Sequence, residues 1–313
     1  MPGAQVDGYR EHGNHHGAGM SISALLQPVV KELSPGFKVR RLLPNFKCQS
    51  IGPFLFFDHF GPVDVAADDN HDVRPHPHIG LATVTYLYEG AMMHRDSLGI
   101  VQRIAPGAIN LMTAGSGIVH SERTPDDLRG VAHRTHGLQL WLALPQAMEE
   151  CAPSFSHTPA TDIPCHHHPS CEIRVLIGNA FELHSPVPTY SETLYLDIAM
   201  PAGEQFELPA LAPEMGIYLL DGRVQLDTTQ LAPGTIALLD TARPSLLRSD
   251  SAARFVIIGG APLDSPRFIS WNFVSSRRER ILQAGEDWAA QRMGTIPAET
   301  EWIVQPGRIA KAR

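Results

Sequence analysis

The sequence contains one pattern of short strands and turns twice. The segment YLYEG at residues 86–90 is echoed by YLLDG at 218–222, and IAPGAINL at 104–111 is echoed by LAPGTIAL at 231–238. Both pairs are separated by about 130 residues, close to the length of one domain. The repeat therefore predicts two copies of the same fold in tandem, with small differences in loop length.

Each copy consists of short strands. From Leu81 to Tyr88 apolar and polar residues alternate, which is typical of a half-buried strand. Glycine-containing turns then separate strand-length runs at 100–104, 108–113 and 118–123. A spacing of roughly 8–12 residues between strands favours a sandwich or barrel, and the 26 Gly and 26 Pro suit many turns. We expect a mainly β protein with two tandem β-barrels and a short C-terminal helix.

Changes in composition divide the chain into five parts. We expect a disordered leader at 1–20, a first barrel with the metal site at 21–150, a linker at 151–170, a second barrel without ligands at 171–270, and a helix with a tail at 271–313. The leader holds His12, His15 and His16, which could bind a metal loosely.

The C-terminal part has a helical pattern. Residues 276–279 (SRRE) have the pattern of a capping box. Ile281, Leu282, Trp288 and Ala289 then recur at helical spacing. We expect an amphipathic helix over about 276–291 that packs on a barrel.

Charge and cysteine content exclude several classes of protein. The formal net charge of −8 disfavours direct binding to nucleic acid. No apolar run approaches the roughly 18 residues of a membrane span, and the N-terminus lacks the apolar core of a secretory signal. Four scattered cysteines fit a reducing compartment better than a disulfide framework. We expect a cytoplasmic, monomeric protein.

Two pairs of possible metal ligands lie in the first barrel. His76 and His78 are two residues apart, as are His120 and Glu122, so within a strand each pair faces one way. If hairpins bring the pairs onto neighbouring strands, three imidazoles and one carboxylate converge. This set suits iron, manganese, cobalt, nickel or copper better than structural zinc. An octahedral ion would keep two positions open for water, O2 or substrate.

A pair of histidines at a strand end is weak evidence alone, because polar residues with local partners are common there. The second barrel acts as an internal control. Counting from the repeated segments places Leu208 and Ala210 at the positions of the first pair, and Leu247 and Ser249 at those of the second. The fold therefore does not require histidines at these positions, which favours a ligand role in the first barrel.

Other histidines are interpreted as structural. His94 could support a ligand or line the pocket, but pairing with a neighbouring acid is the preferred interpretation. We expect His59 to be a hydrogen-bonded structural residue. Residues 166–168 (HHH), with Cys165 and Cys171, have the composition of a metal cluster. They lie in the proline-flanked linker, where an exposed loop with opportunistic binding is favoured.

Several motifs resemble the pirin family of the cupin superfamily. They are RPHPHIGLATVTYLYEG at 74–90, HRDSLG at 94–99, MTAGSGIVHSERTP at 112–125, FLFFDHFGP at 54–62, HGLQLWLALP at 136–145 and IGGAPL at 258–263. The resemblance covers roughly residues 21–290. It implies two cupin barrels, the first holding an iron ion with His76, His78, His120 and Glu122 as ligands. Many relatives place a Glu where this chain has Ala82, so we expect a less polar pocket wall.

The resemblance implies two possible functions. The first is an iron-dependent dioxygenase of the quercetin 2,3-dioxygenase type, in which Glu122 takes the hydroxyl proton of a flavonol-like aromatic that reacts with O2. The alternative is a non-enzymatic regulator, in transcription or metabolism, whose protein partner reads the state of the iron. The same ligands serve both functions. Fe(II) or Fe(III) is expected, with Mn, Co, Ni, Cu and Zn as alternatives.

Overall fold

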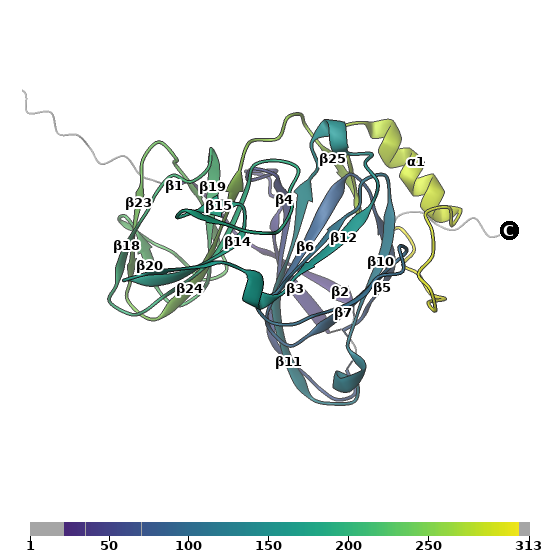
Figure 1. The fold of residues 1–313 in the computed structure, drawn as a ribbon, viewed down its shortest axis with the longest axis horizontal. Coiled ribbons are helices and arrows are strands. Elements are labelled where there is room, and N and C mark those ends of the chain that lie inside the picture. Colours follow the sequence, from purple (N-terminus) through teal and green to yellow (C-terminus); the bar gives the residue numbers. More distant parts are fainter. Residues whose placement is uncertain (1–21, 35, 70, 307–313) are drawn as a thin grey trace, which may run out of the picture.

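The computed structural model describes residues 22–34, 36–69 and 71–306. Two β-barrels lie side by side, the first on the right of Figure 1 and the second on the left, and one α-helix packs beside the first. The predicted mainly β fold with two barrels and a C-terminal helix is confirmed. The expected leader at 1–20 lies outside the described residues. None of the helices in the described part has the length and apolar character needed to cross a membrane.

The first barrel combines a large and a small antiparallel sheet. The large sheet has the strand order β12 (Ser154–Thr158), β9 (Ile109–Thr113), β6 (Leu81–Glu89), β11 (His133–Ala143), β4 (Phe54–Val65), β3 (Phe37–Leu43) and β2 (Val29–Ser34). The small sheet has the order β5 (Val73–His78), β10 (Ile118–Arg123), β7 (Met92–Asp96) and β8 (Val101–Ile104).

The second barrel repeats this architecture. Its large sheet has the order β1 (Ile22–Leu26), β22 (Ile236–Leu239), β19 (Glu214–Asp221), β24 (Ala253–Gly260), β17 (Thr193–Met200), β14 (Cys171–Ile177) and β13 (Cys165–His168). Its small sheet has the order β18 (Gln205–Leu208), β23 (Ser245–Ser249), β20 (Val224–Leu226) and β21 (Thr229–Gln230). Two short hairpins complete the strands: β15 (Asn179–Ala180) with β16 (Leu183–His184), and β25 (Phe268–Ser270) with β26 (Phe273–Ser275).

Strand pairing crosses the expected boundaries between the domains. Strand β1, expected in the first barrel, pairs with β22 of the second. Residues 151–170, expected to be a bare linker, contribute β12 to the first barrel and β13 to the second. The segment after the second barrel returns to the first, where Ile79 and Phe273 form a bridge. Each barrel therefore contains segments from distant parts of the chain.

Strand β6 is buried on both faces, which differs from the expected half-buried strand. Its apolar residues Ala82, Val84 and Tyr86 belong to a core that also contains Tyr195 and Tyr218 of the second barrel. The threonines between them, Thr83 and Thr85 among the buried polar residues, lie on the opposite face of the strand, inside the first barrel. The alternation therefore separates an inter-barrel core from a polar barrel interior, and not a core from solvent.

The C-terminal helix α1 (Arg278–Ala289) confirms the predicted helix but not its capping box. Arg277 occupies the N-cap position and makes no capping hydrogen bond with its side chain. The Ser276 hydroxyl instead donates to Glu149 at 3.0 Å. Ile281 and Trp288 are buried, whereas Leu282, expected on the apolar face, is exposed.

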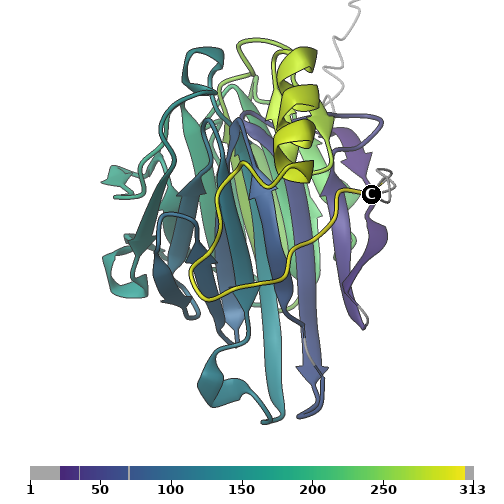
Figure 2. The same cartoon turned by 90° about the vertical axis from the view of Figure 1, so that its right-hand side faces the viewer.

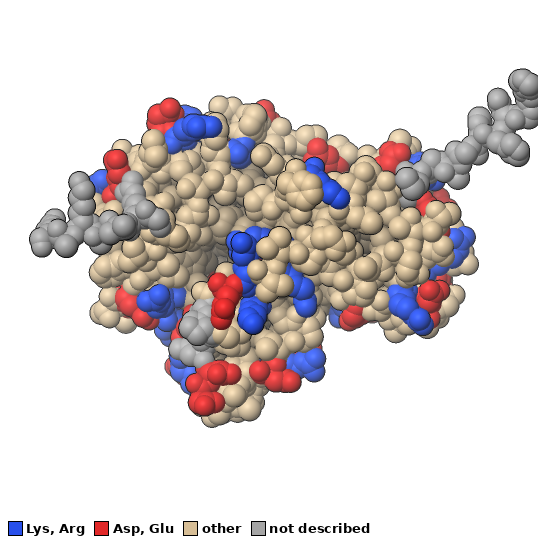
Figure 3. Space-filling model, turned by 180° about the vertical axis from the view of Figure 1, so that it is seen from behind, with Lys and Arg blue, Asp and Glu red and all other residues tan. Residues whose placement is uncertain are grey.

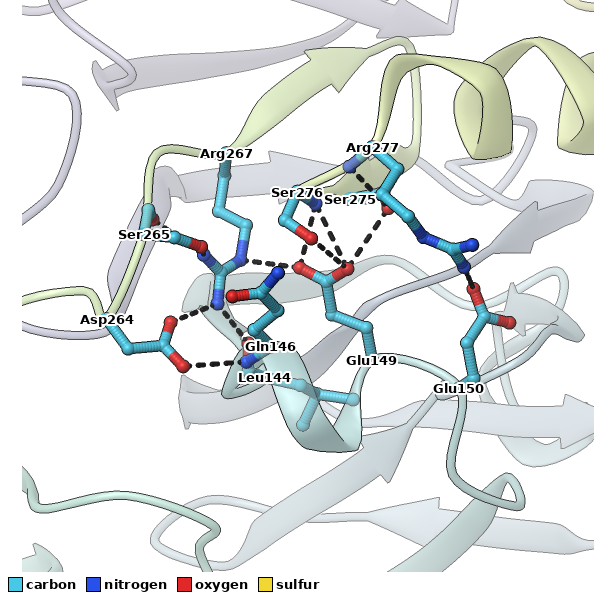
Figure 4. A network of polar contacts seen from close by, with 10 residues as sticks. All are labelled: Leu144, Gln146, Glu149, Glu150, Asp264, Ser265, Arg267, Ser275, Ser276 and Arg277. Carbon is cyan, nitrogen blue, oxygen red and sulfur yellow. Dashed lines mark hydrogen bonds and ion pairs between the residues drawn. The ribbon is translucent and has the colours of Figure 1, made fainter.

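A buried carboxylate holds the return segment against the first barrel (Figure 4). Glu149 lies 2.7 Å from the guanidinium of Arg267, and both side chains are almost completely buried. The main-chain N–H of Ser276 donates to Glu149 at 2.8 Å, and Arg267 donates to the carbonyl of Leu144 at 2.8 Å. Because a buried charge without a partner is costly, these contacts fix the path of the chain ahead of α1.

Charges of both signs share the surface. In the view from behind in Figure 3, a group of basic side chains lies near the middle of the face, and acidic side chains adjoin basic ones around it. This face has no continuous basic stripe of the kind that follows a phosphate backbone. The absence of direct nucleic-acid binding stays a prediction.

Candidate metal site

The two pairs of predicted ligands lie on neighbouring strands. Strands β5 and β10 pair antiparallel, with His76 directly opposite His120 and His78 opposite Ile118. Because residues two apart in a strand share a face, His76 and His78 both point to the side on which His120 lies. The expected convergence of the three histidines is confirmed.

The three imidazoles form a compact buried cluster. One ring nitrogen from each lies within 4.8 Å of the others. The ring centroids are 4.3 Å apart for His76 and His120, 5.0 Å for His78 and His120, and 5.1 Å for His76 and His78. All three side chains are buried in the first barrel. A single ion could therefore contact all three rings.

The protonation of these rings fits a metal ion. Burial lowers the pKa of His76 to about 4 and holds the pKa values of His78 and His120 well below the usual range, so all three are neutral at pH 7. Nδ1 of His76 is 2.9 Å from the carbonyl of Arg74, which fixes its proton there and leaves Nε2 with a free lone pair. His78 Nδ1 and His120 Nε2 are buried with no hydrogen-bond partner among the described residues. A metal ion is coordinated by neutral imidazoles through ring nitrogens whose lone pairs are free.

Glu122 lies beside this cluster and not within it. The pairing of β5 with β10 shifts register between His120 and Glu122, which moves the carboxylate away from the position that regular spacing would give it. Its oxygens are not part of the group of atoms within 4.8 Å. Glu122 lines the same cavity, and burial raises its pKa to about 7. The role of Glu122 as a ligand stays a prediction.

The histidines open into a cavity of about 370 Å³ with aromatic walls. The rings of Phe56 and Trp141 stack at 3.9 Å, and Trp141 meets His78 edge to face at 5.1 Å. The guanidinium of Arg41 covers the outer face of Phe56 at 4.3 Å and pairs with Asp58 at 2.6 Å. A larger cavity of about 530 Å³ lies outside the packed interior of the second barrel, among connecting segments within 178–194 and at 211–212, and has no comparable cluster of ligands among its lining residues.

A C-terminal segment after α1 crosses the first barrel, as the yellow trace in Figure 2 shows. Ile303 and Pro306 line the cavity. The main-chain N–H of Ile303 donates to the carbonyl of Pro75 at 2.8 Å, and the indole of Trp288 donates to the carbonyl of Ile303 at 2.9 Å. Sequence patterns beyond residue 293 carry no signal for this contact, because the segment has no regular secondary structure.

His94 connects the cluster to a buried carboxylate. Its Nε2 lies 2.9 Å from Asp96, which confirms the predicted pairing with a neighbouring acid. Its Nδ1 lies 3.4 Å from Nδ1 of His120. Because Nε2–H of His94 donates a hydrogen bond to the Asp96 carboxylate, Nδ1 of His94 is the acceptor for His120. This arrangement places the proton of His120 on Nδ1 and leaves Nε2 for a ligand. The ring of His94 stacks on Phe155 at 4.4 Å.

Two other sequence-based interpretations have clear outcomes. His59 is a hydrogen-bonded structural residue, as expected, with Nδ1 2.5 Å from the hydroxyl of Tyr218 and Nε2 2.8 Å from Nε2 of His136. The prediction for Ala82 is wrong. Ala82 does not line the histidine cavity, because it faces the inter-barrel core, so it cannot set the polarity of the pocket wall.

Comparisons with known proteins agree with these features. The Pirin family model matches residues 36–142, and the model of the pirin C-terminal cupin domain matches 195–294. A pirin-like protein of Caulobacter vibrioides is 42% identical over 260 residues, which cover 82% of this chain and 90% of that protein. Pirin of Mus musculus is 32% identical over 273 residues, covering 85% and 91%. A crystal structure of quercetin 2,3-dioxygenase from Acinetobacter baumannii matches with a TM-score of 0.85 at 34% identity, covering 93% and 97%. The chain therefore belongs to the pirin family, and its two barrels are cupin domains.

Proposed function

We propose that the first barrel is an oxygenase site of the quercetin 2,3-dioxygenase type. His76, His78 and His120 would hold one first-row metal ion, with iron as the expected metal and Glu122 as a fourth ligand or a base beside it. One observation carries this proposal: three neutral, buried imidazoles with free nitrogens open into a cavity with aromatic walls. The likeness to a quercetin 2,3-dioxygenase structure supports it.

The cavity walls favour a flat, uncharged aromatic substrate. The stacked pair of Phe56 and Trp141 provides apolar surface beside the histidines. The only cationic side chain among the described lining residues is Arg41, which is paired with Asp58 by two hydrogen bonds of 2.8 and 2.6 Å. A substrate with a free carboxylate would therefore find no unpaired cation among the described lining residues, whereas a flavonol would find aromatic surface on which to pack.

Glu122 is suited to move the proton of a substrate hydroxyl. With a pKa raised to about 7 by burial, its carboxylate is poised between the protonated and ionised forms near neutral pH. It lies on the cavity wall, two residues after His120 on β10. A bound metal ion would supply open coordination positions and favour the ionised form of this carboxylate.

The direct test is turnover of quercetin by the full chain loaded with iron. We expect O2 to be consumed and carbon monoxide to be released, and we expect His120→Ala to abolish both. His184→Ala, which changes an exposed histidine of the second barrel, serves as a matched control and should keep full activity. Iron-loaded protein that leaves quercetin intact would contradict the proposed activity.

A second candidate function is a binding module that responds to the metal. One observation favours it: the C-terminal segment that lines the cavity through Ile303 also exposes Trp302 and Val304 at the surface. A change at the site could therefore alter a surface that a protein partner contacts. A partner retained in a pull-down only by metal-loaded protein, without turnover of quercetin, would support this function. The cytoplasmic location and the monomeric state stay predictions.

A further inference from the structure

The hairpin of β13 and β14 carries a second set of metal-ligand side chains. Cys165 and His167 are two residues apart on β13, so they share one face. Glu172 on β14 lies directly opposite His167 in the register. One ligand atom from each of the three side chains lies within 4.8 Å of the other two. The expected exposed loop is therefore a paired strand at the edge of the second barrel.

This set has the same layout on the ladder as the histidine cluster of the first barrel. There, His76 and His78 occupy one strand two residues apart, and His120 lies opposite His76 on the neighbouring strand. Here, Cys165 and His167 occupy one strand, and Glu172 lies opposite His167. An antiparallel ladder brings three donors arranged in this way to one side of the sheet, because directly opposed side chains are about 5 Å apart.

We propose that Cys165, His167 and Glu172 bind one zinc ion, with a water molecule as the fourth ligand. A thiolate, an imidazole and a carboxylate form a donor set that zinc accepts in tetrahedral geometry. The sulfur disfavours magnesium and calcium, which prefer oxygen. Together the thiolate and the carboxylate balance the two positive charges of the ion.

The side chains can reach the required geometry without movement of the backbone. Nδ1 of His167 is 4.0 Å from the nearer carboxylate oxygen of Glu172. Two ligands of a tetrahedral zinc ion at bonds of about 2.0–2.1 Å are separated by about 3.3 Å. The His167 and Glu172 side chains are 78% and 57% exposed, so they are free to close this difference by rotation. The strand pairing of β13, β14 and β17 holds the backbone beneath them.

The Cys165 thiol contacts the proposed ligand Glu172 and the main chain of Ile173. Arg174 lies opposite Cys165, but its guanidinium donates to the Tyr86 hydroxyl and to the carbonyls of Gly107 and Ala160. Burial raises the pKa of Cys165, with the charge of Glu172 adding to the effect. Zinc must therefore displace the thiol proton, and one proton is released for each ion bound at neutral pH. The affinity should increase as the pH rises.

The other two histidines of the triplet belong to the opposite face of the hairpin. His166 stacks on Phe181 at 5.0 Å, and His168 contacts Phe206 edge to face at 5.0 Å. Both rings cover the core of the second barrel, to which Phe206 belongs. His166 is therefore a matched control: it is the same residue type on the same strand, and it is not a ligand in this proposal.

The experiment is a zinc titration of the full chain carrying His120→Leu, which removes one of the three histidines of the first site and so weakens metal binding there, in competition with a chromophoric chelator. We expect one equivalent of zinc to bind at micromolar concentrations. Cys165→Ser and His167→Ala should each weaken binding at least about tenfold, and His166→Ala should change it less than about twofold. Substitution with cobalt should give a thiolate-to-metal charge-transfer band that Cys165→Ser removes.

Two results would overturn the proposal. One is binding that Cys165→Ser leaves unchanged, and the other is binding that His166→Ala weakens as much as His167→Ala. Circular dichroism of each variant establishes that the hairpin is still folded. The readout does not depend on the function of the first barrel, because the first site carries the same His120→Leu change in every sample and the compared substitutions all lie on β13.

Discussion

The two barrels share one scaffold and differ at the positions that form the candidate metal site. In the first barrel, His76 lies opposite His120, which lies opposite Asp96, and His94 lies opposite Glu122. In the second barrel, the same register brings together Phe206 with Leu247, Leu247 with Leu226, and Val224 with Ser249. The histidines, the glutamate and the supporting pair of His94 and Asp96 are thus all replaced, mostly by apolar residues.

This difference indicates how much packing energy the fold loses at the candidate metal site. Phe206, Val224, Leu226 and Leu247 are at most 3% exposed and belong to one continuous core. Burial of such a side chain contributes roughly 1.5–3 kcal/mol each. At the matching positions the first barrel lacks this apolar packing and has a cavity lined by imidazoles, of which His78 Nδ1 and His120 Nε2 have no hydrogen-bond partner among the described residues. A site that holds a metal ion is therefore locally destabilising until the ion binds.

The largest expected effect on stability comes from placing a histidine in the core of the second barrel. Leu247→His should lower the free energy of unfolding by about 4 kcal/mol, because it removes a fully buried leucine and buries a polar ring without a partner. Leu247→Met keeps the volume and should cost less than about 1.5 kcal/mol. Denaturant unfolding measures both. Equal stability of the two variants would show that the second barrel is not packed as described.

The converse change is His120→Leu in the first barrel. It installs the residue that the second barrel has at this position and removes one of the three donors. We expect at least about a hundredfold loss of affinity for iron, since even changes beyond the ligands cost ten- to a hundredfold. The metal-free protein should be as stable as the parent or more stable. Metal analysis after dialysis is the measurement, and unchanged metal content would exclude His120 as a ligand.

The sequence was sufficient for the strands and for the convergence of three histidines, because both follow from a period of two and a visible repeat. It was not sufficient for the register of the second barrel. The chain between the ligand strand and the repeated tyrosine is two residues longer there (208 to 218, against 78 to 86). The counterparts of His76 and His78 are therefore Phe206 and Leu208, and not the expected Leu208 and Ala210.

Long-range contacts account for the other differences. The pairing of β1 with the second barrel and the crossing of the C-terminal segment over the first depend on partners far away in the sequence. The shift of Glu122 away from the histidines comes from an irregularity in strand pairing that no local pattern indicates. The capping box at Ser276 is lost because Glu149 offers this hydroxyl a buried carboxylate, and the charged partner dominates.

A third prediction concerns the contact between the barrels, where His59 of the first barrel meets Tyr218 of the second. Burial lowers the pKa of the neighbouring His136 to about 4, from 6.5 in the unfolded chain. Between pH 6.5 and 4 the unfolded chain therefore binds more protons, so stability falls as the pH is lowered through this range. We expect His136 to contribute about 2 kcal/mol to this loss.

His136→Gln removes one titrating group and should reduce the slope of unfolding free energy against pH between pH 6.5 and 4. The parent protein is the reference, because burial also lowers the pKa values of His59 and of the three site histidines, and these four residues are present in both samples. His133→Gln is the control for the loss of a histidine from the same strand. An identical slope for the His136 variant and the parent would place the acid sensitivity elsewhere.

The smallest expected effect concerns His94, which contacts the proposed ligand His120 and is not itself a proposed ligand. Its substitution tests whether such a residue contributes to the affinity for metal. His94→Val gives the residue that occupies the matching position in the second barrel, Val224, and removes the ring between Asp96 and His120. The affinity for iron should fall about tenfold, equal to about 1.4 kcal/mol, because the Nδ1 proton of His120 loses its acceptor.

His94→Gln separates positioning from packing. Its side chain can accept a hydrogen bond from His120 and donate one to Asp96, so it should recover part of the lost affinity, while a variant that only fills space should not. The electron paramagnetic resonance spectrum of a bound paramagnetic metal should also change with His94→Val and return toward the parent with His94→Gln. If both variants lose affinity equally, the ring of His94 acts through its packing against Phe155. The hydrogen bond between His94 and His120 is then not among the features that distinguish the first barrel from the second.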